Sequence, residues 1–304
     1  MSVGVVIPTL NAGKRWSECL QAIGVQTLHP DRRLVIDSAS TDQTMAQAEA
    51  AGFDVVRIER AQFNHGGTRQ WAVEYLDGCD VIVFLTQDAI LASPDALAEI
   101  VRCFEDPKVA VAYGRQLPHR WATPIEAHAR LFNYGAVTVR KDSVAAQRLG
   151  TKAFFCSNSF AAYRRATLLG LGGFRRDLIL EEDAEYAARA IKAGYANVYC
   201  ASSRAYHSHD YTVSEQLARY FDLGVFDARN AWLREEFGSH GGEGWRFIKS
   251  EFHYLVRHAP WQIPRAWIHT GAKFLGYLLG RWERRLPLGM KRRISMSPRY
   301  WANA

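Results

Sequence analysis

Short apolar runs alternate with helix-like periodicities along the first 113 residues of the chain. The runs cover residues 3–7, 34–36, 55–58, 81–85 and 109–113. Between them, apolar residues recur every three or four positions, which predicts helices over about 14–25, 43–52 and 94–104 and another that begins after residue 64. This alternation predicts an α/β fold, with a mostly parallel sheet, helices on both of its faces and right-handed crossovers.

The pattern changes after Gly114. Residues 115–152 are rich in Arg, His and aromatic side chains but have no clear period, so we expect an irregular lid or mobile loop there. Short strands are predicted at 159–163 and 197–200, with a helix between them that ends at Gly194. From Thr212 on, the chain is helical, aromatic and basic, with a glycine-rich break at 238–244. We therefore predict two domains, 1–211 and 212–304.

The run at 81–85 leads directly into polar residues. Its five apolar side chains predict a strand that is buried on both faces. Thr86, Gln87 and Asp88 follow, at the edge where open α/β sheets bind ligands. Asp88 is thus a candidate ligand for a divalent cation, with two neutral oxygen donors beside it. The alternative is that Asp88 caps the next helix, but Ser93-Pro94 is a better helix start.

Other polar clusters follow other strands, at 37–42, 64–69 and 207–210, and parallel strands bring such clusters to one edge. Asp37 could accept a hydrogen bond from a nucleotide base or could instead form a turn. His65 and Gly66 begin a loop that lets backbone approach a ligand, and Arg69 could neutralise a phosphate. No dinucleotide or P-loop glycine motif is present, so this loop alone is weak evidence.

Two histidines extend the possible metal site. His207 or His209 could join Asp88 around Mg²⁺ or Mn²⁺, since Mg²⁺ prefers oxygen ligands and Mn²⁺ tolerates imidazole. Histidines near a strand end are more often ordinary hydrogen-bonded surface residues. The neighbouring carboxylates make a metal-binding role for these histidines more nearly as well supported as a surface role.

An acidic cluster at 181–185 begins the helix that ends near Gly194. The helix dipole favours acids in a first turn, which would explain one or two of them. Four acids within five residues exceed that need. Asp183 or Glu182, facing a cleft, could accept a proton from a hydroxyl nucleophile as a general base.

The ordered set of motifs resembles the family 2 glycosyltransferases of GT-A fold, over about residues 3–211. Two of the segments, 63–69 and 85–89, are similar to the rhamnosyltransferase branch of that family, as is 207–209 followed by an aromatic helix. The motifs are, in chain order, Pro8-Thr9-Leu10-Asn11, Asp37 with Ser40-Thr41-Asp42, Thr86-Gln87-Asp88 in place of Asp-x-Asp, Gly172-Gly173-Phe174, and Glu182-Asp183 with Arg189 and Gly194.

The resemblance implies a Rossmann-like GT-A sheet and inverting transfer of a sugar from a nucleotide diphosphate donor. It implies that Asp183 is the base, with Glu182 as its neighbour, and that Asp88 and His207 or His209 hold the metal. Thr86 stands where the family has the first Asp of its motif, which leaves metal binding to Asp88 and neutral ligands. Donor contacts are expected from Pro8, Thr9, Asn11, Asp37, Ser40, His65, Gly66, Arg69, Thr86, Gln87 and Asp88, and acceptor contacts from Trp121, Asn158 and Arg189.

The net positive charge of the chain lies in its last third. Residues 1–211 hold 23 Lys/Arg and 23 Asp/Glu, so the formal net charge of +7 lies entirely in 212–304. There, a helical stripe of large apolar residues precedes a basic segment. This predicts a helix in a membrane interface, although a core helix with a solvated basic tail is nearly as well supported. The stripe comprises Trp267, Gly271, Phe274, Leu278 and Trp282, with Ile268, Leu275 and Leu279.

Composition favours a globular protein with a sizeable core, since 48% of the residues are hydrophobic. Five cysteines without metal-ligand spacing are expected to be reduced thiols, as in the cytoplasm. No run reaches the length of about 18 apolar residues that spans a bilayer, and no signal peptide is evident at the start. Basic residues without a nucleic-acid motif make nucleic acid the least favoured partner.

Together these features predict an enzyme on the inner face of the cell membrane that moves L-rhamnose from dTDP-L-rhamnose to a lipid-linked saccharide. One alternative is a transferase for another nucleotide sugar, such as a UDP-hexose. Another is a nucleotide-sugar-binding protein without turnover, which the paired acids at 182–183 disfavour, because binding alone needs no base.

Overall fold

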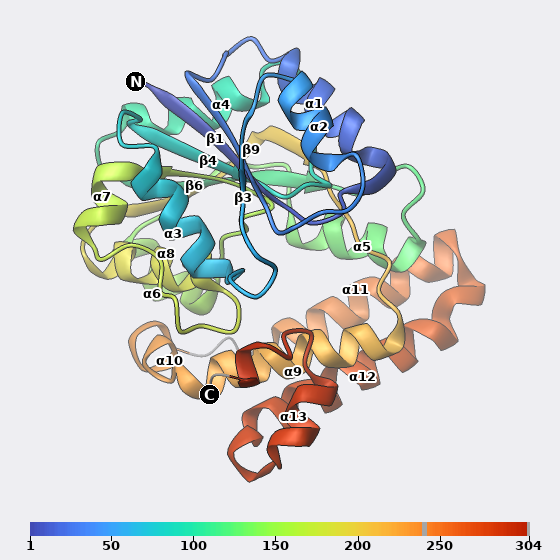
Figure 1. The fold of residues 1–304 in the computed structure, drawn as a ribbon. Coiled ribbons are helices and arrows are strands. Elements are labelled where there is room, and N and C mark those ends of the chain that lie inside the picture. Colours follow the sequence, from blue (N-terminus) through green and yellow to red (C-terminus); the bar gives the residue numbers. More distant parts are fainter. Residues whose placement is uncertain (239–241, 303–304) are drawn as a thin grey trace. The chain divides into compact units, whose positions relative to one another are not determined.

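A computed structural model describes residues 1–238 and 242–302 (Figure 1). The chain forms two compact units, each built from three segments. The first comprises 1–117, 134–176 and 182–207, and the second comprises 118–133, 177–181 and the chain from Ser208 on. The predicted glycine-rich break at 238–244 includes residues 239–241, which lie outside the described residues. The predicted domain limit after residue 211 stays a prediction.

A nine-stranded sheet forms the centre of the first unit. Its order is β3-β2-β1-β4-β8-β6-β9-β5, and β7 pairs with β9. The predicted mostly parallel arrangement is confirmed: β1, β2, β3, β4, β6 and β9 point one way, and β8, β5 and β7 run against them. The strands are β1 (Val3–Thr9), β2 (Arg32–Asp37), β3 (Asp54–Arg57), β4 (Val81–Leu85), β5 (Ile90–Leu91), β6 (Val109–Leu117), β7 (Val139–Lys141), β8 (Phe160–Arg164) and β9 (Ala196–Tyr206).

Helices cover both faces of this sheet, as predicted (Figure 1). On one face, Trp16 of α1 and Leu97 of α4 pack against Val83 in a single apolar cluster. On the other face, the ring of Phe84 contacts the rings of Tyr163 and Phe174, in the core that α3 and α8 cover. Because side chains alternate along a strand, β4 supplies both cores and is wholly buried. The helices are α1 (Trp16–Gly24), α2 (Thr44–Ala50), α3 (His65–Tyr75), α4 (Ala96–Arg102), α6 (Ser143–Leu149), α7 (Arg165–Gly170) and α8 (Glu182–Lys192).

Two local predictions were wrong. Residues 115–152 are not an irregular lid: β6 continues to Leu117, and α5 (Pro124–Asn133), β7 and α6 follow. The periodicity of α5 was hidden because its buried face includes Glu126 and His128 as well as Ile125. The helix expected from Pro94 begins at Ala96, and no side chain caps its start.

The second unit is helical. Its main helices α9 and α12 lie side by side and run in the same direction, since Gly276 packs against the Leu217 carbonyl and Gly280 against that of Phe221 (Figure 1). Among the described helices, none is both long enough and apolar enough to cross a membrane. Besides α5, this unit contains α9 (Val213–Arg229), α10 (Trp232–Phe237), α11 (Glu243–His258), α12 (Ile263–Arg281) and α13 (Leu288–Ile294).

Candidate active site

The ends of β1 and β2 are joined by the carboxylate of Asp37. This residue is fully buried, and its Oδ2 accepts hydrogen bonds from Thr9 Oγ1 at 2.8 Å and Ser40 Oγ at 2.6 Å. Its Oδ1 accepts one from the Ser40 backbone N–H at 2.7 Å. The structure therefore gives Asp37 the turn-forming role that the sequence left open. Its expected contact with a nucleotide base stays a prediction.

The same network fixes the loop that follows β1. Pro8 is the penultimate residue of that strand. Asn11 lies in the left-handed region at φ 46°, where an Asn is tolerated better than most residues. Its backbone N–H donates to Ser40 Oγ at 2.7 Å, and its side-chain oxygen accepts from the Thr41 N–H at 2.9 Å. Asn11, Ser40 and Thr9 therefore lie together at this edge of the sheet, as the sequence predicted.

Gln87 holds two strand ends together. Its side chain accepts a hydrogen bond from the Leu10 N–H at 2.8 Å and donates one to the Leu10 carbonyl at 3.2 Å. Thr86 beside it is different, because its buried hydroxyl has no hydrogen-bond partner among the described residues. A buried polar atom in this state is open to a water or a ligand atom. Thr86 is therefore the better candidate of the two for a direct donor contact.

Asp88 and His207 form the candidate metal pair. Asp88 Oδ2 lies 3.6 Å from His207 Nε2. His207 Nδ1 lies 2.9 Å from Gln116 Oε1, and the Gln116 amide is oriented by its own donation to Ser157 Oγ at 2.8 Å. Since an amide oxygen only accepts, Nδ1 carries a hydrogen, and Nε2 faces Asp88. This orientation is typical of metal-ligating histidines, so the residues fit a divalent cation.

Gln116 and Ser157 are absent from the sequence-based site. Gln116 was missed because the strand before it was expected to end at Tyr113, so it was not seen as a residue near a strand end. His209 lies two positions after His207 and belongs to the second unit, so its part in metal binding stays a prediction.

Glu182 forms a buried ion pair with Arg69. The Arg69 Nη1 to Glu182 Oε1 distance is 2.6 Å, and the two side chains are 7% and 6% exposed. The same oxygen accepts from Asn158 Nδ2 at 2.9 Å. Burial alone would raise the pKa of Glu182, but the charge of Arg69, together with His65 and the hydrogen bond from Asn158, outweighs burial and lowers the pKa. Glu182 is therefore ionised and tightly held by its neighbours.

Asp183 is bound differently from Glu182. Its Oδ2 accepts the Asn158 backbone N–H at 2.7 Å, and its Oδ1 accepts the Ala184 N–H at 2.8 Å. Asp183 is 8% exposed and lies in the first turn of α8. Glu181, the residue just before this helix, adopts a left-handed φ of 63°. Both of these hydrogen bonds come from backbone amides, which stabilise a carboxylate.

Residues 157–159 connect these parts of the site. Ser157 orients Gln116 and through it His207, while Asn158 binds Asp183 and Glu182. The Ser159 carbonyl accepts the backbone N–H of Thr86 at 3.4 Å. This is possible because β8 runs antiparallel to β4, so that the start of β8 lies beside the end of β4.

The glycine at the start of α3 is required by the fold. A Cβ on Gly66 would lie 1.9 Å from the Arg175 carbonyl oxygen, so the close approach here is to the chain itself. Asn64 caps the helix by accepting the Gly67 N–H at 2.7 Å. His65 lies in its first turn and Arg69 one turn later. Donor contacts by His65 and Gly66 stay predictions.

The three expected acceptor residues are in different environments. Asn158 is engaged with Glu182, and its side-chain oxygen accepts from Tyr163 at 2.7 Å. Arg189 binds the Glu185 carboxylate and donates to the carbonyl of Gly173 at 2.6 Å, so it holds the glycine turn before Phe174. Trp121, in the second unit, is half-exposed. Their contacts with an acceptor stay predictions.

The sequence matches a known enzyme family. The family model "Glycosyl transferase family 2" matches residues 4–170. The chain is 48% identical over 304 residues to the O-antigen chain rhamnosyltransferase RfbN of Salmonella typhimurium, covering 100% of this chain and 97% of the relative. It is also 48% identical over 303 residues to the O-antigen chain rhamnosyltransferase WbaN of Salmonella anatum, covering 99% and 96%.

Solved structures share the fold. The mannosyltransferase PcManGT of Pyrobaculum calidifontis, in complex with GDP-Man and Mn²⁺, has a TM-score of 0.65 at 20% identity, covering 93% of this chain and 87% of that one. TarS 1–349 of S. aureus, in complex with UDP-GlcNAc, has a TM-score of 0.55 at 14% identity, covering 94% and 92%. These likenesses confirm the GT-A fold that the sequence motifs predicted.

Proposed function

Because this chain belongs to glycosyl transferase family 2, we propose that it transfers L-rhamnose from dTDP-L-rhamnose to a hydroxyl of a lipid-linked saccharide in surface-polysaccharide synthesis. The rhamnosyl donor is supported by the two rhamnosyltransferase relatives, which match the chain end to end. The single observation that supports this chemistry is that residues 157–159 connect Asp183 to the Asp88–His207 pair. Asn158 donates to Asp183, while Ser157 accepts from Gln116, which in turn binds His207.

Asp183 is the general base of this proposal. A single displacement at the anomeric carbon inverts its configuration and needs one group to take the proton of the attacking hydroxyl. Asp183, held by two backbone amides, is a fixed carboxylate suited to that task. Glu182 is the positioning neighbour, since Arg69 and Asn158 already occupy its Oε1.

The departing dTDP carries the negative charge that must be stabilised. Asp88 and His207 would hold a divalent cation, Mg²⁺ or Mn²⁺, which when bound neutralises diphosphate oxygens as a Lewis acid. The chain contributes the orientation of both ligands and, from Thr86, an unpaired hydroxyl. Mn²⁺ in the similar PcManGT complex supports a cation in this fold. His209 would be a further ligand.

The nucleoside would lie over the ends of β1 and β2. There the proposal assigns donor contacts to the loop of Pro8, Thr9 and Asn11 and to the Asp37–Ser40 turn. The acceptor side would use Trp121, with Asn158 and Arg189 shaping the site from behind. A lipid-linked acceptor would place the enzyme in the cytoplasm, peripherally on the inner face of the cell membrane.

The test of the base is Asp183→Asn. An amide keeps the size of the side chain but cannot take a proton, so transfer should fall by about three orders of magnitude, the middle of the usual range for general-base catalysis. Calorimetric binding of dTDP should be unchanged, which separates catalysis from donor binding. Near-normal transfer by the variant would refute the assignment of Asp183.

A second measurement addresses the donor and the metal. Calorimetric titration with dTDP, UDP and GDP, each with and without Mn²⁺, should show tightest binding for dTDP with the metal present. Asp88→Ala should remove the metal-dependent part of dTDP affinity. A preference for UDP would keep the chemistry and replace the donor by a UDP-hexose. Failure of all three nucleotides to bind would overturn the transferase proposal.

A further inference from the structure

The two faces of α12 carry residues of opposite size. Its buried positions include Ala266, Ala272, Gly276 and Gly280. A Cβ added at Gly276 would lie 2.2 Å from the Leu217 carbonyl oxygen, which shows how closely the backbones of α12 and α9 approach. The small residues thus account for packing within the unit. Several large apolar residues of the helix are instead exposed.

Those large residues face outward. Trp267 is 54% exposed, Phe274 65% and Trp282, at the end of the helix, 56%. At 100° per residue they form one stripe with Ile268, Gly271 and Leu275, all exposed, and the stripe contains no charged residue. At a rise of 1.5 Å per residue, the stripe from Trp267 to Trp282 is about 22 Å long. Single exposed apolar residues are ordinary, but a continuous stripe of this length is not.

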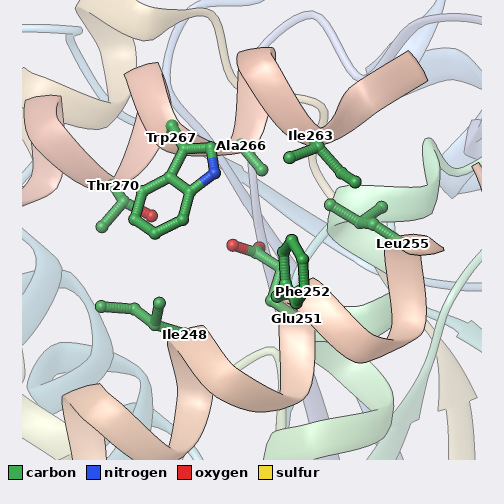
Figure 2. Close-up of a pocket in the computed structure, with 8 residues that line it drawn as sticks. All are labelled: Ile248, Glu251, Phe252, Leu255, Ile263, Ala266, Trp267 and Thr270. Atoms are coloured by element: carbon green, nitrogen blue, oxygen red, sulfur yellow. The ribbon is translucent and has the colours of Figure 1, made fainter. Parts of the chain in front are cut away.

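The preceding helix extends the stripe into a wider surface. On α11, Trp245 is 75% exposed, and Phe252 and Val256 follow at the spacing of one helical face. Phe252 lines a shallow groove with Trp267, and the carboxylate of Glu251 lies between them (Figure 2). We call this surface the aromatic face; its residues are Trp245, Phe252, Val256, Trp261, Trp267, Ile268, Phe274, Leu275 and Trp282.

The surroundings of the aromatic face are strongly basic. Arg265 and Arg281 flank the α12 stripe, and Arg284, Arg285 and Arg293 follow it, all exposed. Residues 212–304 carry the whole net charge of +7. A second copy of so basic a surface would be repelled, whereas an anionic one would be attracted. Exposed Trp residues beside Arg are typical of helices that lie in a membrane interface.

We propose that the aromatic face is the surface by which the protein docks on an anionic lipid bilayer, with the aromatic rings at headgroup depth and the arginines on lipid phosphates. This deepens the proposed function, on which it rests for the lipid-linked acceptor. It assigns docking to α11 and α12 together. In this proposal α12 is not a core helix, because it packs against α9 with one face and binds lipid with the other.

The test uses the full-length protein, because removing α12 would uncover α9. The variant Trp245→Gln, Trp261→Gln, Phe274→Gln replaces the three most exposed rings. The matched control is Val25→Gln, Val137→Gln, Val144→Gln, which changes equally exposed residues of the first unit. The probe is co-sedimentation with phosphatidylcholine vesicles that contain one quarter phosphatidylglycerol, with pure phosphatidylcholine alongside.

Wild-type protein and control should bind the anionic vesicles, with a blue shift of Trp fluorescence, and the aromatic variant should bind about tenfold or more weakly. Arg284→Gln, Arg285→Gln, Arg293→Gln should weaken the anionic-vesicle binding and its salt dependence. Equal binding by the aromatic variant would overturn the proposal. The proposal would also be overturned if wild-type protein did not bind anionic vesicles, or if the main change in the aromatic variant were from dimer to monomer in sedimentation.

Calorimetric binding of dTDP by the same proteins separates the two proposals. Normal dTDP binding with lost vesicle binding is the expected result for the aromatic variant. A wild type that binds vesicles but no nucleotide would refute the proposed function alone. A wild type that binds dTDP but no vesicles would refute the docking surface alone.

Discussion

Two adjacent acids at the start of α8 differ in their partners. Glu182 pairs with the guanidinium of Arg69 in a buried position, while Asp183 accepts from backbone amides. Breaking a buried ion pair costs more than the pair contributes, because it leaves the other charge buried and unpaired. The pair therefore links the stability of the first unit to the site.

Arg69→Met should destabilise the protein by about 3–5 kcal/mol at neutral pH. The folded pKa of Glu182 is lowered, so the stabilisation is fully present above its unfolded value of 4.5 and is lost as the pH falls through the folded pKa. Urea unfolding at pH 7 and at about pH 4 should therefore show a smaller difference between wild type and variant at the lower pH.

The control for this prediction is the double variant Arg69→Met, Glu182→Gln. The neutral amide no longer needs a cation, and its oxygen still accepts from Asn158, so the double variant should regain part of the lost stability. If single and double variants were equally unstable, the loss would come from packing and not from the buried charge.

At this scale the sequence predicted the clusters better than the contacts. Asp88, His207 and Asp183 were proposed from the sequence because acids and histidines follow apolar runs. Gln116 and Ser157, which orient His207, were missed because Gln116 lies beyond the expected end of its strand and the contact between them joins distant parts of the chain. Hydrogen bonds between residues that are 41 positions apart leave no local pattern.

Secondary-structure elements were predictable where burial is apolar and regular. β4 is buried on both faces and appears in the sequence as an unbroken apolar run. The antiparallel pairing of β8 with β4 could not be predicted, because side-chain alternation is the same in either direction. α5 was missed because its inner face includes Glu126 and His128.

The contact between α9 and α12 gives a prediction for these elements. Gly276→Ala should destabilise the protein by about 1–3 kcal/mol, since its Cβ would meet the Leu217 carbonyl oxygen and backbone cannot easily move aside. Gly271→Ala, on the same helix, has no atom within 4 Å of the added Cβ and should stabilise by up to about 1 kcal/mol. Thermal unfolding of both variants measures the difference, and equal effects would contradict the close packing.

Across the molecule, the five cysteines are free, and four of them are buried. Burial raises the pKa of the Cys19 and Cys156 thiols, which makes them poor nucleophiles. Of the five, Cys103 is partly exposed, but a hydrogen bond with Cys200 and burial raise the pKa of its thiol as well. Thiol titration of native protein should therefore show slow reaction at Cys103 alone, and titration in guanidinium should show five thiols. Several fast-reacting thiols in the native protein would contradict this burial.

The two units are interleaved along the chain, which has a consequence for synthesis on the ribosome. His128 Nε2 of α5 lies 2.9 Å from Ser250 Oγ of α11, a residue 122 positions later. At about 5–20 residues per second, α5 leaves the ribosome about 6–24 s before its partner is made. During that interval a helix with a strongly apolar inner face would be prone to aggregate. We expect the polar residues Glu126 and His128 in the inner face of α5 to limit aggregation of this segment until α11 has been made.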